Sequence, residues 1–246
     1  MVGPFVRGAG YALRGLTLVA HPRLRGFVLI PLAINLLLFG GGLWWGSSAL
    51  ADWIDRQIAA LPDWLHWLHW LIVPVLVVAA ALVLFYGFSV LANLLGAPFN
   101  SLLAERVEDL LHPGRVRPAG RSLLGEASAA IGGAVRALVY FVACALPLLV
   151  LLFIPGLNAA FPFVWLAFSA WMLALQYLDY PMGNHGLGFA EQRRRHAGNR
   201  RLVFGFGAGV LLLTLVPGLN FLAMPAGVIG ATLLWAENPQ PPSAGR

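Results

Sequence analysis

The hydrophobic pattern of the chain consists of long uncharged runs separated by polar connections. Phe27 to Trp45 contains 19 residues without a charge, and Leu71 to Leu95 contains 25. A membrane-spanning helix needs about 20 predominantly apolar residues. The pattern therefore predicts two spanning helices, over residues 26–46 and 71–95.

The apolar stretches of the second half are interrupted twice by the tetrapeptide Pro-Gly-Leu-Asn, at residues 155–158 and 217–220. The arms around the second copy, 202–216 and 226–235, have 15 and 10 residues. They correspond to about 22 and 15 Å of helix, against a hydrocarbon core of about 30 Å. We therefore expect a helical hairpin over 202–236 that enters the membrane only partly.

The first copy predicts a similar hairpin over 137–177. Its first arm, Ala137 to Ile154, has 18 residues and nearly reaches spanning length, so length is decisive only for the second hairpin. Non-helical backbone at membrane depth is tolerated where it is buried in protein or lines a water-filled cavity. The two tips therefore indicate a pathway for a polar solute.

Shorter segments flank these elements. Residues 1–25 are partly amphipathic and predict a segment lying at the membrane interface. We expect the second span to close near Asn93 and a separate amphipathic helix to follow over 101–111. That helix would have Leu102, Leu103, Val107 and Leu110 on one face and Glu105, Arg106, Glu108 and Asp109 on the others. The polar residues 238–246 predict a disordered tail.

The composition indicates an all-α integral membrane protein with one membrane domain, residues 1–237. Of the 246 residues, 59% are hydrophobic and 11% charged, whereas soluble domains carry about 25% charged residues. The net charge of +6 comes from arginines, because the chain has no lysine. These arginines lie mainly in connections between apolar segments, which argues against nucleic acid as a partner.

Arginine counts in successive connections predict the orientation. Four arginines precede the first span, one lies in 46–70, five lie in 96–136 and five lie in 178–201. Because arginine-rich connections favour the cytoplasm, we expect residues 46–70 to face outward. The protein would then cross the membrane more than once.

Several kinds of chemistry have no candidate residues. Without lysine there is no Walker-type phosphate loop and no Schiff-base amine, and the single Cys144 excludes disulfides within one chain. Motifs of intramembrane proteases are absent from the sequence.

His66 and His69, near Asp63, are spaced to share a metal, but tryptophans around them favour an aromatic belt at the entrance of a span. We therefore expect no enzyme, no cofactor and no metal.

One basic stretch is a candidate anion site. Arg23, Leu24, Arg25 and Gly26 come directly before the first long helix. Backbone N–H groups at a helix start and planar guanidinium groups both suit a tetrahedral oxyanion. The alternative is that these arginines only anchor the orientation.

Asn35 and Asn93 are the notable polar side chains within the spans. They either line a pathway or form hydrogen bonds between helices.

Glycine pairs in two segments favour close helix packing. Gly42 and Gly46 are four residues apart in the first span, and Gly205 and Gly209 repeat that spacing in the second hairpin. Small residues at this spacing allow helix backbones to approach each other.

Long stretches of the chain closely resemble the CysZ family of bacterial sulfate permeases. The stretches are Pro-Arg-Leu-Arg-Gly-Phe-Val-Leu-Ile-Pro (22–31) with Asn35, Ala-Pro-Phe-Asn-Ser-Leu-Leu-Ala-Glu (97–105), Ser-Ala-Trp-Met-Leu-Ala-Leu-Gln-Tyr-Leu-Asp-Tyr-Pro (169–181) with Asn184 and His185, Asp-Trp-Leu (63–65) and Gly-Ala-Thr (230–232). The resemblance runs nearly from end to end.

The resemblance implies uptake of sulfate across the inner membrane for assimilation into cysteine. It also implies two long spanning helices with partly inserted helix pairs. The family's sulfate site is a Gly-Leu/Ile-Arg-Arg stretch before the first long helix. Here Leu24 and Arg25 match it, while Arg23 and Gly26 occupy the outer positions in exchanged order. Glu105 and Arg106 are similar to charged residues near the family's proposed pathway, to which we add Asn35 and Asn100 as candidates.

We conclude from the sequence that the chain is a channel-like sulfate permease that acts as a homo-oligomer in lipid, because two spans cannot enclose a pore. Sulfite is a second candidate ligand. Two alternatives remain. One is a membrane scaffold or regulator that binds sulfate or sulfite without conducting it. The other is a proton-coupled carrier, which the absence of acidic residues from the spans disfavours.

Overall fold

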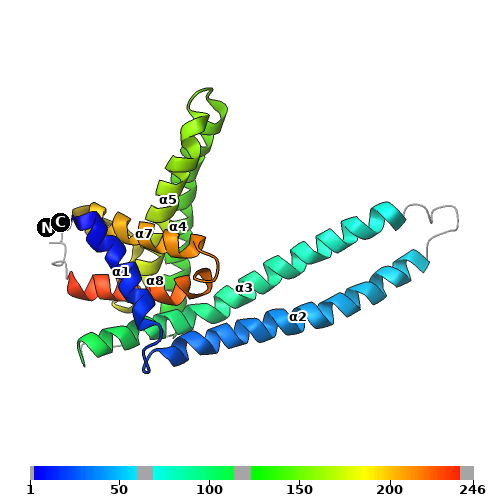
Figure 1. Ribbon diagram of the computed structural model, residues 1–246, viewed down its shortest axis with the longest axis horizontal. Coiled ribbons are helices and arrows are strands. Elements are labelled where there is room, and N and C mark those ends of the chain that lie inside the picture. Colours follow the sequence, from blue (N-terminus) through cyan, green and yellow to red (C-terminus); the bar gives the residue numbers. More distant parts are fainter. Residues whose placement is uncertain (1–2, 60–68, 114–122, 239–246) are drawn as a thin grey trace. The chain divides into compact units, whose positions relative to one another are not determined.

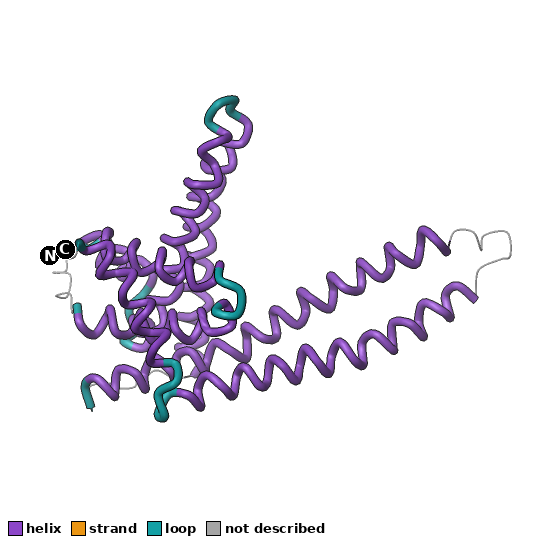
Figure 2. Tube along the Cα trace, in the orientation of Figure 1, coloured by secondary structure: helices purple, strands orange, loops and turns teal. Residues whose placement is uncertain are grey.

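The computed structural model of the chain describes residues 3–59, 69–113 and 123–238, and every regular element in this part of the chain is helical (Figures 1 and 2). The α-helices are α1 (Pro4–Leu18), α2 (Arg25–Ala59), α3 (His69–Leu111), α4 (Leu123–Val150), α5 (Phe161–Asn184), α6 (Phe189–Gly198), α7 (Arg200–Leu215) and α8 (Asn220–Glu237). Two short 3₁₀ turns, η2 (Leu151–Phe153) and η3 (Asn158–Ala160), lie between α4 and α5. The all-α prediction is confirmed for these residues.

The chain divides into two compact units. One contains Met1–Gly26 and Asn100–Arg246, and the other contains Phe27–Phe99. In the first unit, α1 packs on α7 and α8, and α5 packs on the same two helices (Figure 1). The centre of this packing is apolar, with Leu202, Phe206, Val210, Ile229 and Leu233 fully or almost fully buried. These side chains form the closely packed interior of this unit.

Glycines bring α1, α7 and α8 into close backbone contact. A Cβ atom on Gly8 would overlap the carbonyl of Leu202, and one on Gly205 would overlap the carbonyl of Phe5. A Cβ on Gly209 would lie 2.9 Å from the Cβ of Ala12. The prediction that Gly205 and Gly209 form a close-packing face is therefore confirmed.

Helix α1 has a second face that the first unit leaves uncovered. Val6 and Leu13 are both exposed, although they are apolar. The predicted interfacial segment is thus a helix packed on its own unit, with a free apolar side.

Helix α3 is continuous where the sequence predicted a break. It runs through Gly96 and Pro98 to Leu111, so the separate helix over 101–111 is the end of α3. A proline within a helix removes one backbone hydrogen bond, and prolines are tolerated in membrane helices when other groups satisfy the freed carbonyl. The predicted faces are also partly wrong, because Leu102 is 45% exposed whereas Glu108 is buried.

The second unit consists of most of α2 and the first part of α3, which run antiparallel (Figure 2). A Cβ on Gly46 would lie 3.3 Å from a methyl carbon of Leu84, which marks a contact between the two helices. The predicted spans 26–46 and 71–95 fall inside helices that are longer, with 35 residues in α2 and 43 in α3.

The two Pro-Gly-Leu-Asn segments form the same turn. Gly156 and Gly218 have φ angles of 85° and 86°, in the region that favours glycine. In each copy the asparagine N–H donates to the carbonyl four residues earlier, from Asn158 to Ile154 and from Asn220 to Val216, at 3.2 Å. The tetrapeptide therefore determines the hairpin tip locally.

The arms of the two hairpins differ in length. Three described segments are long and apolar enough to cross a membrane: Arg25–Arg56, Gly132–Phe153 and Asn158–Asn184. Helices α7 and α8 are not among them. The arms of the first hairpin thus reach spanning length. The 10-residue arm predicted after the second tip is wrong, because α8 has 18 residues and continues through Pro225.

Two predictions fall partly or wholly outside the described residues. Asp63 and His66, from the proposed aromatic belt or metal pair, lie in the undescribed segment 60–68. The predicted tail is described only at Asn238.

Candidate functional site

The predicted anion-binding stretch forms the junction between α1 and α2. Leu24 is buried, while Arg23, Arg25 and Gly26 are exposed. The carbonyl of His21 accepts hydrogen bonds from the N–H groups of Leu24 and Arg25, both at 2.9 Å. Nδ1 of His21 accepts from the N–H of Arg23 at 3.3 Å. Three backbone donors at the helix start are therefore already bonded.

The guanidinium groups of this junction remain available for an anion. Among the described residues, no carboxylate lies within 4 Å of Arg23 or Arg25. A Cβ on Gly26 would meet no atom within 4 Å, so the glycine leaves space beside the helix start. Buried Leu24 anchors the loop, and the exposed residues Arg23 and Arg25 flank it in the sequence.

The predicted pathway residues are distributed over the fold. Asn35 is half-buried in α2, in the second unit. Asn100, Glu105 and Arg106 lie on the last part of α3, in the first unit, where Glu105 is half-buried and Arg106 exposed. Of these four residues, only Asn100 enters the polar cluster described next.

A polar cluster joins the ends of α3 and α5. Nδ2 of Asn100 donates to the hydroxyl of Tyr180 at 3.2 Å. Ser101 donates from its hydroxyl to the side-chain oxygen of Asn184, whose amide donates back to the Ser101 carbonyl at 2.9 Å. The cluster thus connects two of the stretches that carry the family resemblance.

The same cluster contains a buried carboxylate, Glu108, which the sequence analysis placed on the polar side of an amphipathic helix. The side chain of Glu108 is 5% exposed, and its two oxygens lie 2.7 and 2.9 Å from Nε2 of His185. A buried carboxylate is stable only when it is paired or hydrogen-bonded. The ring of His185 also lies 5.9 Å from that of Trp235, which links the cluster to α8.

An ion pair connects α1 to the end of α8. Arg14 donates to both oxygens of Glu237, at 2.6 and 2.9 Å, and the hydroxyl of Tyr11 donates to Glu237 at 2.9 Å. The hydrogen bonds from Arg14 lower the pKa of the Glu237 carboxyl and raise the pKa of Arg14. Because the two side chains are 52% and 36% exposed, solvent screens most of this interaction.

One histidine within the arginine-rich connection, His196, is buried. His196 is 2% exposed, and its Nε2 has no hydrogen-bond partner among the described residues. Burial lowers the pKa of His196 to about 4, so the ring is neutral near pH 7. It has the environment of a core side chain.

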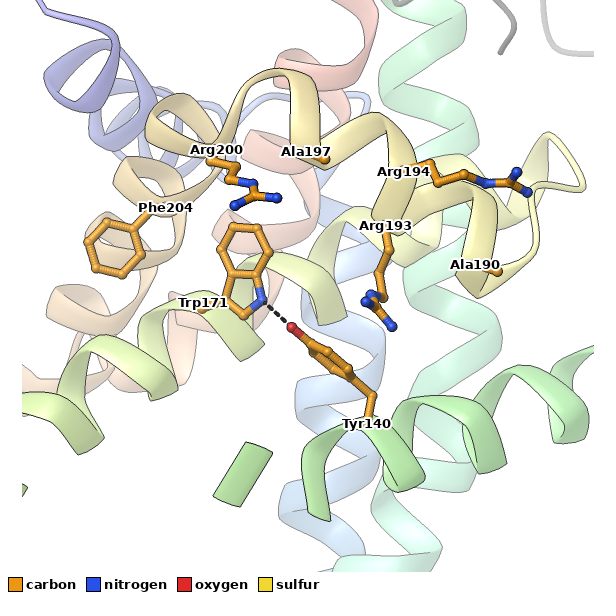
Figure 3. Close-up of a pocket in the computed structure, with 8 residues that line it drawn as sticks. All are labelled: Tyr140, Trp171, Ala190, Arg193, Arg194, Ala197, Arg200 and Phe204. Atoms are coloured by element: carbon orange, nitrogen blue, oxygen red, sulfur yellow. Dashed lines mark hydrogen bonds between the residues drawn. The ribbon is translucent and has the colours of Figure 1, made fainter. Parts of the chain in front are cut away.

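A pocket of about 760 Å³ lies beside α6 and was not expected from the sequence. Its walls include Tyr140 of α4, Trp171 of α5 and three arginines from α6 and α7, Arg193, Arg194 and Arg200 (Figure 3). The sequence analysis used these arginines only to predict orientation. The run of three arginines at 193–195 was the available signal, but its aromatic neighbours come from distant helices.

A family profile described as "Sulfate transporter CysZ/Etoposide-induced protein 2.4" matches residues 11–225. The sulfate transporter CysZ of Pectobacterium atrosepticum is 41% identical over 232 residues, covering 94% of this chain and 84% of the relative. That of Pseudomonas fluorescens is 41% identical over 239 residues, covering 96% of each chain. That of Vibrio atlanticus is 42% identical over 230 residues, covering 93% of this chain and 91% of the relative.

The apolar helices of spanning length and these matches define an all-α membrane protein. The chain belongs to the Sulfate transporter CysZ/Etoposide-induced protein 2.4 family. The resemblance inferred from the sequence is therefore confirmed.

Proposed function

We propose that the chain is a sulfate permease that conducts sulfate across the bacterial inner membrane and so supplies cysteine synthesis. The observation that carries this proposal is the identity of about 40% to relatives named sulfate transporter CysZ, over more than nine tenths of this chain. The relatives are named as transporters, which agrees with a protein that moves an ion without chemical change.

The arginine junction before α2 supports a sulfate site. Arg23 and Arg25 are exposed and have no described carboxylate within 4 Å. An anion that arrives there meets two guanidinium groups that no described acidic side chain neutralises. Because the backbone N–H groups of Arg23, Leu24 and Arg25 are bonded within the loop, sulfate would be held mainly by the two side chains and by donors beyond them.

The depth of the first hairpin supports partial insertion despite its long arms. Tyr140 and Trp171 lie beside the arginines of α6 and α7, as aromatic side chains at a headgroup level do. Tyr140 is 15 residues before Pro155, which corresponds to about 22 Å of helix. The tip is apolar and exposed, with Phe153 84% accessible. Such a tip is more stable inside a membrane or against protein than in water.

The scarcity of polar groups along the long helices supports an assembly of several copies. Almost none of the most apolar part of α2 is buried within the chain, and Asn35 is a rare polar side chain along it. A hydrated pathway needs polar groups or backbone on several sides. We therefore propose that α2 and α3 contact other copies of the chain as well as lipid.

The test is sulfate flux into liposomes that contain the purified protein. We expect uptake of radiolabelled sulfate that depends on the protein and is lost in the Arg25→Ala variant. A protein that binds sulfate but gives no flux would be a scaffold or regulator, and the permease proposal would be rejected. Flux that requires a proton gradient would identify a coupled carrier instead of a channel. Cross-linking in native membranes tests the assembly.

A further inference from the structure

The pocket beside α6 has a strongly basic wall. Arg193, Arg194 and Arg200 line it. Arg194 contacts Glu191 at 3.4 Å, but no described carboxylate lies within 4 Å of Arg193 or Arg200. In Figure 3, Arg193 points toward Tyr140, and Arg200 lines the same pocket. These two arginines, which have no described acidic partner, therefore line the same pocket as Tyr140 and Trp171.

Two aromatic side chains of the pocket are joined by a hydrogen bond. Nε1 of Trp171 donates a hydrogen bond to the hydroxyl of Tyr140 at 3.1 Å, which joins α4 to α5. The guanidinium of Arg193 lies 4.2 Å from the centre of the Tyr140 ring, within cation–π range. Phe204 of α7 completes the apolar lining. The pocket thus contains both aromatic rings and guanidinium groups.

This combination fits an amphipathic anion better than a free ion. A volume of about 760 Å³ falls within the range of about 300–1,000 Å³ that is typical of sites for drug-sized ligands. A single tetrahedral oxyanion would leave most of it empty. Next to the pocket, α4 exposes apolar side chains, including Leu138 and Val139, along which an acyl chain can lie.

The position in the chain also favours a lipid. The arginines belong to the connection 178–201, whose arginine content predicts a cytoplasmic location. Anionic lipids are attracted to basic segments at that surface, and basic pockets between membrane helices bind their headgroups. Tyrosine and tryptophan are common at the same level.

We propose that this pocket binds the phosphate headgroup of an anionic glycerophospholipid, with Arg193 and Arg200 as the residues that contact the phosphate. Guanidinium groups bind phosphate oxygens through paired hydrogen bonds. The lipid would contact both arms of the α4–α5 hairpin and the α6–α7 connection, and would hold them together. The proposal depends on the membrane location of the chain and not on sulfate transport.

The test is native mass spectrometry of the full chain in detergent, titrated with phosphatidylglycerol or phosphatidylcholine. We expect the protein to retain phosphatidylglycerol in preference to phosphatidylcholine. The double variant Arg193→Gln/Arg200→Gln should weaken phosphatidylglycerol binding at least tenfold, because two charge-assisted contacts are removed. Arg201→Gln is the matched control. Arg201 is exposed, adjacent to Arg200 and outside the pocket lining, so its loss should change binding less than twofold.

A second variant guards against misfolding of the double variant. Ala197→Glu adds a negative charge at an exposed residue of the lining and should produce a similar loss by repelling the headgroup. Sodium phosphate and sodium sulfate, added at millimolar concentration, test for a free oxyanion. Equal retention of phosphatidylglycerol by the wild-type protein and both pocket variants would overturn the proposal. Displacement of the lipid by inorganic phosphate or sulfate would also overturn it, since the site would then bind a free ion.

Discussion

The carboxylate of Glu108, near the end of α3, lies 2.7 Å from Nε2 of His185 at the end of α5. The pair joins two segments that are 77 residues apart in sequence, and it does so at a buried position. Asn100 and Tyr180 connect the same two helices at 3.2 Å. The ends of α3 and α5 are thus held by polar contacts, whereas α1, α5, α7 and α8 are held mainly by apolar packing.

We expect His185→Ala to destabilise the protein by about 1–3 kcal/mol, because the Glu108 carboxylate would stay buried without this partner. Thermal unfolding in detergent measures the effect. Glu105→Ala, at a half-buried glutamate of the same helix, is the control and should have a smaller effect. A double-mutant cycle with Glu108→Ala and His185→Ala should give clear coupling. Additive losses would show that the pair contributes nothing specific.

We expect Arg25→Ala to weaken sulfate binding about tenfold to a hundredfold, the range for loss of one charge-assisted contact of about 1.5–3 kcal/mol. Arg25→Lys should also lose affinity, because an ammonium group lacks the planar pair of donors. Isothermal titration of the purified protein gives the affinities. Arg14→Ala is a weaker control than the sequence suggested, because Arg14 pairs with Glu237. Arg201→Ala is preferable, and an equal loss in that variant would remove the assignment.

We expect the hairpin tips to be protected from water-soluble reagents on the outer side. In a Cys144→Ala background, Asn158→Cys and Asn220→Cys should react slowly with a charged maleimide added outside. Ser48→Cys, in the exposed part of α2 that is predicted to face outward, should react fast. Labelling of a tip at the rate of the Ser48→Cys variant would mean that its hairpin crosses the membrane completely.

We expect stability to fall as pH decreases from about 6.5 to 4 because of His196. Its pKa is lowered to about 4 in the folded protein, whereas an unfolded histidine titrates near 6.5. Within this window the unfolded chain binds the additional proton, so acid favours unfolding, by about 3 kcal/mol at pH 4. Melting temperatures of the wild type and of His196→Gln should differ in pH dependence over this range. Parallel curves would contradict the prediction.

We expect Gly8→Ala to destabilise the packing of α1 on α7, because the new Cβ would overlap the carbonyl of Leu202. Overpacking of this kind typically costs about 1–3 kcal/mol. Gly10→Ala is the matched control in the same helix, since a Cβ there would meet nothing within 4 Å. That substitution should be neutral or stabilising by up to about 1 kcal/mol. The two melting temperatures therefore separate steric contact from helix propensity.

Local features of this protein could be predicted from the sequence. Apolar runs such as Phe27 to Trp45 require a helix in a membrane, because every backbone group must be bonded within the segment. The Pro-Gly-Leu-Asn turns are also local, since proline restricts φ before a glycine that can adopt a positive φ. Gly205 and Gly209 indicated close packing because their spacing alone places them on one helix face.

Helix boundaries at proline were predicted less well. The second span was expected to close near Asn93 and the last arm to begin at residue 226, yet α3 continues through Pro98 and α8 includes Pro225. A proline removes one hydrogen bond, and the surrounding structure decides whether the helix tolerates that loss. The length of an arm therefore cannot be obtained from the position of its prolines.

The tertiary structure alone decided which polar residues meet. Periodicity placed Glu108 on the polar side of an amphipathic helix, but α5 supplies His185 and makes the position a buried one. The sequence analysis treated Arg193 and Arg200 as orientation signals. In the folded protein they line a pocket together with Tyr140 and Trp171, which come from two other helices. A sequence pattern reports which residues share a helix face, whereas burial and partners depend on the helix that packs against that face.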